Sequence, residues 1–149
     1  MTVGPRWTSD QIAAGLLRNG FTGWQVVTMG AICQAESGGY IWAHGLNSHD
    51  PKSIAYLSED HGLFQINDYW GGLMLSPELL AGKYFSQSFS QLAKDPEWNI
   101  AAAREVFLLA ALQRGYAYAY TPWNSFNNGL HKPFLQAARL AAMRAGVLL

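Results

Sequence analysis

The sequence has a single cysteine, Cys33, among its 149 residues, which excludes a fold held together by intramolecular disulfide bonds. Charged residues are also scarce, and ten Lys and Arg balance ten Asp and Glu. This balance argues against a partner attracted over a long range, such as nucleic acid or an anionic membrane surface. The longest apolar run, 106–112, is far too short to span a bilayer, so no membrane insertion is predicted.

A secretory leader is missing as well, because residues 1–10 lack a basic flank followed by an apolar segment. No internal repeat, low-complexity tract or linker divides the chain. Half of the residues are hydrophobic, which is enough for one substantial core. We therefore predict a single domain over residues 1–149 that acts as a monomer, alone or as a piece of a larger protein.

Local signals predict a mainly α-helical domain. Thr8, followed three residues later by Gln11, is the signature of a helix start with reciprocal capping. A mostly apolar helix is predicted over about 24–37, central and buried. Asp95 followed by proline predicts another start, of a helix that ends near Arg114. Other expected elements are a short helix that starts at 76–78, a last helix near 132–145, an aromatic loop at 116–129 and a segment at 84–92 that is ambiguous between helix and loop.

Helical periodicity fails over 40–67, which is rich in Gly, Asn, His, Ser and Asp. We interpret this stretch as a long loop, with or without a short β-hairpin, that ends in a half-buried segment at 63–66. If that segment is extended, the amides of Gln65 and Asn67 point to one side and apolar side chains to the other. The predicted fold is thus a helical domain with a long loop or short β-hairpin flanking a substrate cleft.

One acid, Glu36, lies at the end of the apolar helix, where Gly38 and Gly39 should stop it. The negative end of the helix dipole and apolar neighbours both favour the neutral acid, which can donate a proton. The alternative is a solvated glutamate at a fraying helix end. Cleavage of a glycosidic bond needs such an acid and a second group that stabilises the oxocarbenium-like centre. Asp60, 24 residues later, is a candidate for that second role.

Several motifs follow one another in a specific order: Glu36-Ser37, the run GLFQIN at 62–67, Asn99-Ile100, Trp123 and the run FNNG at 126–129. This arrangement resembles the lysozyme-like superfamily from about Gly23 to Leu140. It looks most like soluble lytic transglycosylase domains and the lysozyme-like cell-wall lytic domains of bacteriophages. The resemblance implies a muramidase acting on the β-1,4 bond between N-acetylmuramic acid and N-acetylglucosamine. It also implies the roles of catalytic acid/base for Glu36, orientation of substrate or acid for Ser37, and substrate contact for Gln65, Asn67, Tyr120, Trp123, Phe126 and Asn127.

Two departures from the transglycosylase pattern leave two reactions open. Transglycosylases usually have Tyr where Phe126 stands, so Tyr118 or Tyr120 must replace its hydroxyl or the site works without it. Asp60, shortly before Gly62, looks more like the animal-type lysozymes, in which an acid at this point pairs with the catalytic Glu. The fold resemblance and Glu36-Ser37 favour a lyase that forms 1,6-anhydro ends, whereas Asp60 and Phe126 favour hydrolysis, which is the reaction we predict. A non-catalytic wall-binding or structural phage domain is the alternative of another class, and the acid at position 36 argues against it.

Aromatic residues gather around these motifs, and we expect about half of them to stack on sugar faces and the rest only to pack. They are Tyr40, Trp42, Tyr69, Trp70, Tyr118, Tyr120 and Trp123.

Three histidines in the 40–67 loop, His44, His49 and His61, together with Asp50, match no recognised zinc spacing. We therefore predict no metal and no cofactor. The expected partner is the peptidoglycan glycan strand, with the protein acting on the bacterial cell wall. Delivery there is expected by a phage particle, by holin-type release or as part of a larger protein.

Overall fold

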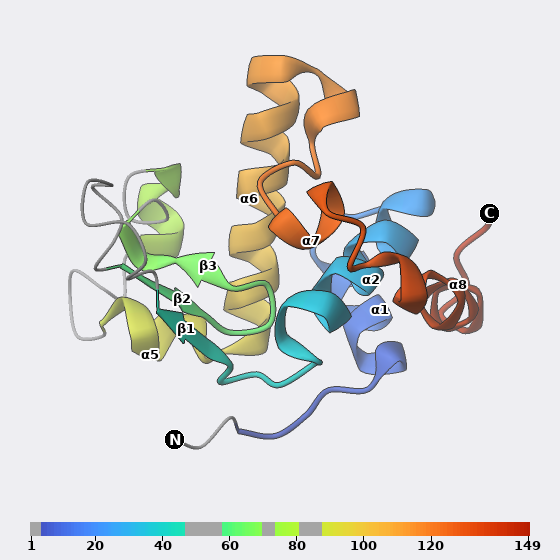
Figure 1. The fold of residues 1–149 in the computed structure, drawn as a ribbon, viewed down its shortest axis with the longest axis horizontal. Coiled ribbons are helices and arrows are strands. Elements are labelled where there is room, and N and C mark those ends of the chain that lie inside the picture. Colours follow the sequence, from blue (N-terminus) through green and yellow to red (C-terminus); the bar gives the residue numbers. More distant parts are fainter. Residues whose placement is uncertain (1–3, 47–57, 70–73, 81–87) are drawn as a thin grey trace.

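The computed structural model describes residues 4–46, 58–69, 74–80 and 88–149. The protein is mainly α-helical with a small three-stranded antiparallel sheet, as predicted. In Figure 1 the sheet and α5 lie on one side of α6, and α1, α2 and α8 gather on the other. The helices are α1 (Ser9–Arg18), α2 (Trp24–Ser37), α5 (Phe89–Ala93), α6 (Pro96–Arg114), α7 (Asn124–Asn127) and α8 (Leu135–Arg144), with 3-10 helices η1 (Tyr116–Tyr118) and η2 (Lys132–Phe134); the strands are β1 (His44–Leu46), β2 (Glu59–His61) and β3 (Ile66–Asn67).

Helix α2 is the central helix of the domain and packs against both α1 and α8. Its middle is buried as predicted, with Ile32 and Cys33 fully inaccessible, although Trp24 at its start is 56% exposed. Burying an aliphatic side chain such as that of Ile32 stabilises the folded state by about 1.5–3 kcal/mol. The helix ends at Gly38, which takes the left-handed conformation (φ 63°) and donates its N–H to the carbonyl of Gln34.

The predicted helix starts are confirmed at α1 and α6. Thr8 and Gln11 form both hydrogen bonds of a capping box. Asp95 accepts two backbone N–H groups at the start of α6, and Pro96 occupies the first helical turn. Such caps stabilise a helix by about 1 kcal/mol each. Helix α6 then runs to Arg114, as predicted.

The less certain segments also follow the sequence signals where the structure describes them. Residues 77–80 are helical after Ser76. The ambiguous stretch 84–92 contains the start of α5, which Ser88 caps, while 81–87 lies outside the described residues. The last predicted helix consists of the 3-10 turn η2 followed by α8. The expected aromatic loop at 116–129 contains η1 and α7.

The sheet pairs β1 with β2 and β2 with β3, so the hairpin form of the 40–67 prediction is confirmed. Asp60 is opposite Gly45 on β1 and Asn67 on β3. His61 is opposite His44. Because side chains alternate along a strand, Asp60 and Asn67 share one face of the sheet, and the two histidines lie on the other.

The segment at 63–66 is not extended, so the condition for its two amides to alternate along a strand is not met. Residues 62–65 form a turn, and Gln65 has a positive φ of 48°, so strand alternation does not set its direction. Leu63 and Phe64 are both fully buried, rather than half-buried. Only residues 66–67 of the GLFQIN run belong to a strand.

The turn exists because Asn99, fully buried on α6, supplies the hydrogen bonds that a neighbouring strand would otherwise give. Its Oδ1 accepts the N–H of Phe64 at 2.8 Å, and its Nδ2 donates to the carbonyls of His61 at 2.9 Å and Ala93 at 3.1 Å. Gly62 passes so close that a Cβ there would collide with Asn99 and with the Ala93 carbonyl. This contact joins the sheet to α6.

Candidate active site

Glu36 is partly buried in the last turn of α2, which the following glycine ends. Its Oε1 accepts a hydrogen bond from the backbone N–H of Ser125 at 3.3 Å. Ser125 belongs to α7, 89 positions later in the chain, and α7 lies beside α2 in Figure 1. The carboxyl group therefore lies where the central helix meets the C-terminal segment.

Ser37, next to the acid, is engaged in the helix end itself. Its Oγ donates to the carbonyl of Cys33 at 3.0 Å and accepts the N–H of Gly39 at 3.1 Å. Only 9% of Ser37 is exposed. These contacts fix the end of the helix that carries Glu36 and leave Ser37 little surface for direct contact with substrate.

Cys33 is one turn before Ser37 and is a core residue. Burial raises the pKa of its thiol to about 12; the hydrogen bond from Ser37 opposes this effect and the nearby Glu36 carboxyl adds to it. The thiol is therefore neutral and inaccessible, which excludes a nucleophilic role.

Asp60 lies partly buried on β2, and its Oδ1 accepts the amide Nδ2 of Asn67 at 2.9 Å. The same amide nitrogen lies 2.8 Å from Ser58 Oγ. The structure thus brings Asp60 and Asn67 together on one face of the sheet.

Gln65 reaches the same face by another route. Its Nε2 donates to the carbonyl of Gly62 at 3.0 Å. Its Oε1 lies 3.0 Å from the position that a Cβ on Gly45 would occupy, directly opposite Asp60 in the sheet register. Both amides of the GLFQIN run are therefore near Asp60, although a turn rather than an extended strand puts the first one there.

With this geometry in place, comparison with known proteins gives one match: a family described as a lysozyme-like domain matches residues 13–111. The chain belongs to this lysozyme-like family. No match was found among curated proteins or among solved structures. Family membership supports action on peptidoglycan at the cell wall, by a reaction of the glycosidase or lytic transglycosylase kind. In the described part of this lysozyme-like domain, no helix combines the length and apolar character needed to cross a membrane.

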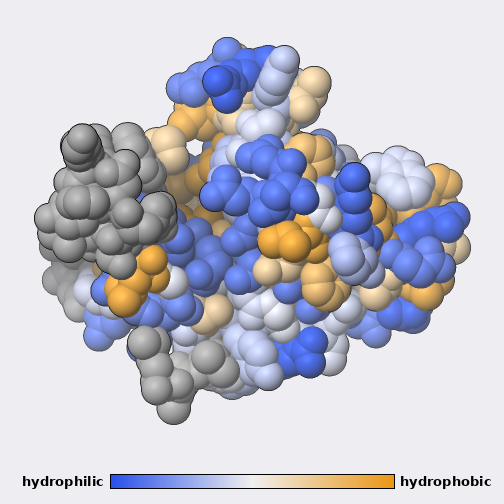
Figure 2. Space-filling model, viewed as in Figure 1, coloured by the Kyte–Doolittle hydropathy of each residue, from blue (hydrophilic) through white to orange (hydrophobic). Residues whose placement is uncertain are grey.

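The segment that follows the matched region of this lysozyme-like domain packs beside Glu36 and the 62–65 turn. Trp123 is buried, and its Nε1 donates to the carbonyl of Phe64 at 3.0 Å. It therefore ties the α7 segment to the turn beside the sheet. Asn127, which is exposed, donates its Nδ2 to the carbonyl of Thr121 at 2.9 Å. In Figure 2 the surface in the region of α7 carries hydrophilic residues next to a hydrophobic patch.

Tyr120 and Phe126 form part of a row of aromatic rings. The Tyr120 ring lies 5.2 Å from Phe107 on one side and 5.2 Å from Phe126 on the other. Burial raises the pKa of the Tyr120 hydroxyl, and a hydrogen bond with the Thr28 side chain partly offsets the effect. The row continues to His131, whose ring centroid is 5.0 Å from that of Phe126.

His131 is a site residue that the sequence motifs did not indicate. It is buried, and its Nδ1 lies 3.0 Å from the carbonyl of Ser125, the residue whose N–H contacts Glu36. It therefore holds in place the backbone beside the acid. A single histidine two residues after the FNNG run carries no pattern that would have revealed this contact. The predicted positions Trp70, His49 and Asp50 lie outside the described residues.

Proposed function

We propose that this lysozyme-like domain is a muramidase that hydrolyses the β-1,4 bond between N-acetylmuramic acid and N-acetylglucosamine, with Glu36 as general acid and base. The observation that carries the proposal is a partly buried carboxyl at the glycine-ended terminus of the central helix, held on one oxygen by the Ser125 N–H. A carboxyl that accepts a hydrogen bond on one oxygen can carry its proton on the other. Glu36 then protonates the leaving glycosidic oxygen and afterwards takes a proton from water.

Asp60 serves in this proposal as the second carboxylate. It stabilises the positive charge that develops at the anomeric carbon or activates the attacking water. The Asn67 amide on Oδ1 fixes the orientation of the carboxylate. The nearby Gln65 and Asn67 amides suit recognition of sugar hydroxyl and N-acetyl groups.

Hydrolysis is favoured over the lyase reaction by the tyrosine positions. Phe126 has no hydroxyl, and the Tyr120 hydroxyl is hydrogen-bonded to Thr28. Thr28 precedes Glu36 by eight residues on the same helix, which is about 12 Å along its axis. Tyr118 is exposed and lies beneath the guanidinium of Arg114. These contacts argue against either tyrosine as the source of the hydroxyl that Phe126 lacks.

The decisive variant is Glu36→Gln, which keeps the shape of the side chain and removes the acid. We expect cleavage of purified peptidoglycan to fall by a factor on the order of a hundred or more. Glu78→Gln makes the same chemical change at an exposed position and should retain full activity. Circular dichroism and thermal melting establish that both variants are folded. Normal cleavage by folded Glu36→Gln would refute the assignment.

Mass spectrometry of the digest distinguishes hydrolysis from the lyase reaction. Hydrolysis leaves reducing ends, whereas a lyase leaves 1,6-anhydro ends that are lighter by one water. Mostly anhydro products would reverse our choice of reaction. Sedimentation of the wild type with insoluble wall, without any release of fragments, would instead indicate a binding or structural domain.

We further propose that the domain acts as a monomer, with one catalytic unit over residues 1–149. A phage particle, holin-type release or a larger protein would carry it to the wall. The balanced charge of the chain supports recognition of glycan strands by local contacts.

A further inference from the structure

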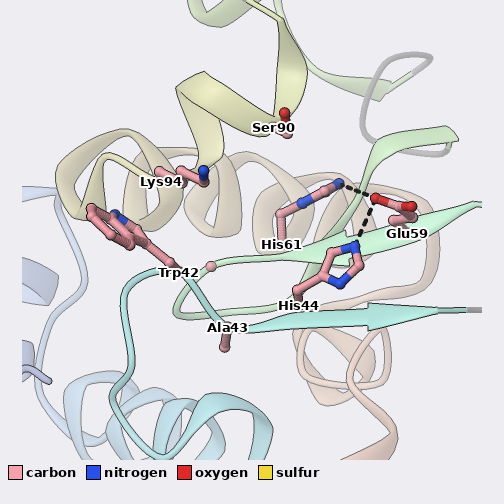
Figure 3. A pocket seen from close by; sticks show the side chains of 8 residues that line it. Trp42, Ala43, His44, Glu59, His61, Ser90 and Lys94 are labelled. Carbon is pink, nitrogen blue, oxygen red and sulfur yellow. Dashed lines mark hydrogen bonds and ion pairs between the residues drawn. The ribbon is translucent and has the colours of Figure 1, made fainter. Parts of the chain in front are cut away.

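Three side chains with metal-binding atoms lie together on the sheet face away from Asp60. His44 Nε2 lies 2.7 Å from Glu59 Oε2, and His61 Nε2 lies 3.7 Å from the same oxygen. One donor atom from each of the three residues lies within 4.8 Å of the other two. Figure 3 shows both imidazole rings directed at the carboxylate.

The sheet register creates this cluster. His44 on β1 is directly opposite His61 on β2. Glu59 precedes His61 by two residues on the same strand and therefore points to the same face. The two imidazoles are largely shielded from solvent, since the His61 side chain is 8% exposed and the His44 side chain 18%.

The cluster borders a pocket of about 210 Å³, also lined by Trp42, Ser90 and Lys94. This volume accommodates an ion and solvent, given that one water takes about 30 Å³ of liquid. The pocket contains a positive charge, the Lys94 ammonium, which lies 5.5 Å from the centre of the Trp42 ring.

A second carboxylate, that of Asp68, lies beside His61 next to this donor set. Asp68 Oδ1 accepts the backbone N–H of Glu59 at 3.0 Å, which leaves Oδ2 3.5 Å from His61 Nε2. Two carboxylates and two imidazoles thus lie together, and a divalent cation bound among them would neutralise the carboxylates.

We propose that His44, Glu59 and His61 bind a zinc ion, with Asp68 in the fourth position. Two imidazole nitrogens with carboxylate oxygens form a donor set typical of zinc. Tetrahedral ligands about 2.0 Å from zinc lie about 3.3 Å from one another, and the 2.7 and 3.7 Å separations bracket that value. With four protein ligands the site is structural. It fastens β1 to β2 and so supports the strand that carries Asp60 on its opposite face.

The test uses untagged full-length protein, freed of metal with EDTA and titrated with Zn²⁺ by calorimetry. We expect one equivalent of zinc to bind, and zinc to raise the melting temperature, because it binds the folded state. With Co²⁺ in place of zinc, the intense visible bands of a tetrahedral complex should appear. Glu59→Gln and His44→Ala should each weaken zinc binding at least tenfold.

Asp60→Asn is the matched control, because it makes the same carboxyl-to-amide change one residue away on the opposite face. It should bind zinc as tightly as the wild type. The proposal is overturned if the wild type shows no saturable binding, if Glu59→Gln binds as tightly as the wild type, or if Co²⁺ gives only the weak spectrum of an octahedral ion. If His44→Ala does not fold, Glu59→Gln decides alone, since its side chain is 39% exposed and tolerates the change. Wall cleavage plays no part in this test.

Discussion

Asn99→Ala removes the side chain that holds the 62–65 turn against α6. The Phe64 N–H loses its acceptor, and the carbonyls of His61 and Ala93 each lose a donor. A buried N–H left without a partner costs about 1–3 kcal/mol, and each carbonyl, with a second lone pair, about 1 kcal/mol. The expected loss in the free energy of unfolding is therefore about 3–5 kcal/mol, a large part of the roughly 5–15 kcal/mol typical of a domain.

Urea unfolding followed by tryptophan fluorescence measures this loss, with an unchanged slope against urea as the sign of a comparable unfolding reaction. Asn128→Ala is the control, because its exposed Oδ1 accepts only the Leu130 N–H in the described structure and its loss should cost less than about 1 kcal/mol. Asn99→Asp should be at least as harmful as Asn99→Ala, since it turns an oxygen toward two carbonyls. If the free energies of unfolding of Asn99→Ala and Asn128→Ala differ by less than about 1 kcal/mol, the hydrogen-bond account of this turn is wrong.

Three further predictions concern Asp60, Cys33 and Tyr120. Asp60→Asn should reduce wall cleavage nearly as much as loss of the catalytic acid, and normal turnover by this variant would remove Asp60 from the chemistry. The raised pKa of Cys33 means that its unfolded thiol ionises near pH 9.0 while the folded one stays neutral up to about pH 12, so stability should fall as pH rises through this range. Urea unfolding at pH 8 and 10 should show that Cys33→Ala lacks this part of the decline, and an equal decline in both proteins would contradict it. Tyr120→Phe should lower the free energy of unfolding by about 0.5–1.5 kcal/mol through loss of the Thr28 bond and leave the cleavage products unchanged; a hundredfold slower reaction would place its hydroxyl in the mechanism.

The helices could be predicted from the sequence because their signals are local. Thr8 with Gln11 marks the start of α1, and Asp95 marks that of α6, each within one helical turn. The end of α2 beside Glu36 follows equally from two adjacent glycines. In each case the stabilising hydrogen bonds join residues that are neighbours in the chain.

The contacts that place Gln65 near Asp60, and those that bring His44 and His61 together, could not be predicted in this way. The turn at Gln65 depends on Asn99, which is 34 residues further along and gave no sign of its three hydrogen bonds. His44 and His61 are brought together by the pairing of β1 with β2. A rule based on the sequence spacing of zinc ligands does not detect such a pair. Both features arise from tertiary structure, where a single long-range contact decides the direction of a side chain.

The hydrogen bond between Ser125 and Glu36 has a consequence for how this domain can be divided. The family match ends at residue 111, whereas Trp123, Ser125 and His131 all lie beyond it. A protein shortened to the matched region would retain the acid and lose the backbone that contacts it, together with α8, which packs on α2. In engineered fusions and domain exchanges, the smallest transferable unit is therefore the helix that carries Glu36 together with the whole C-terminal segment. A chimaera joined near residue 111 would combine this carboxyl group from one parent with its surroundings from the other.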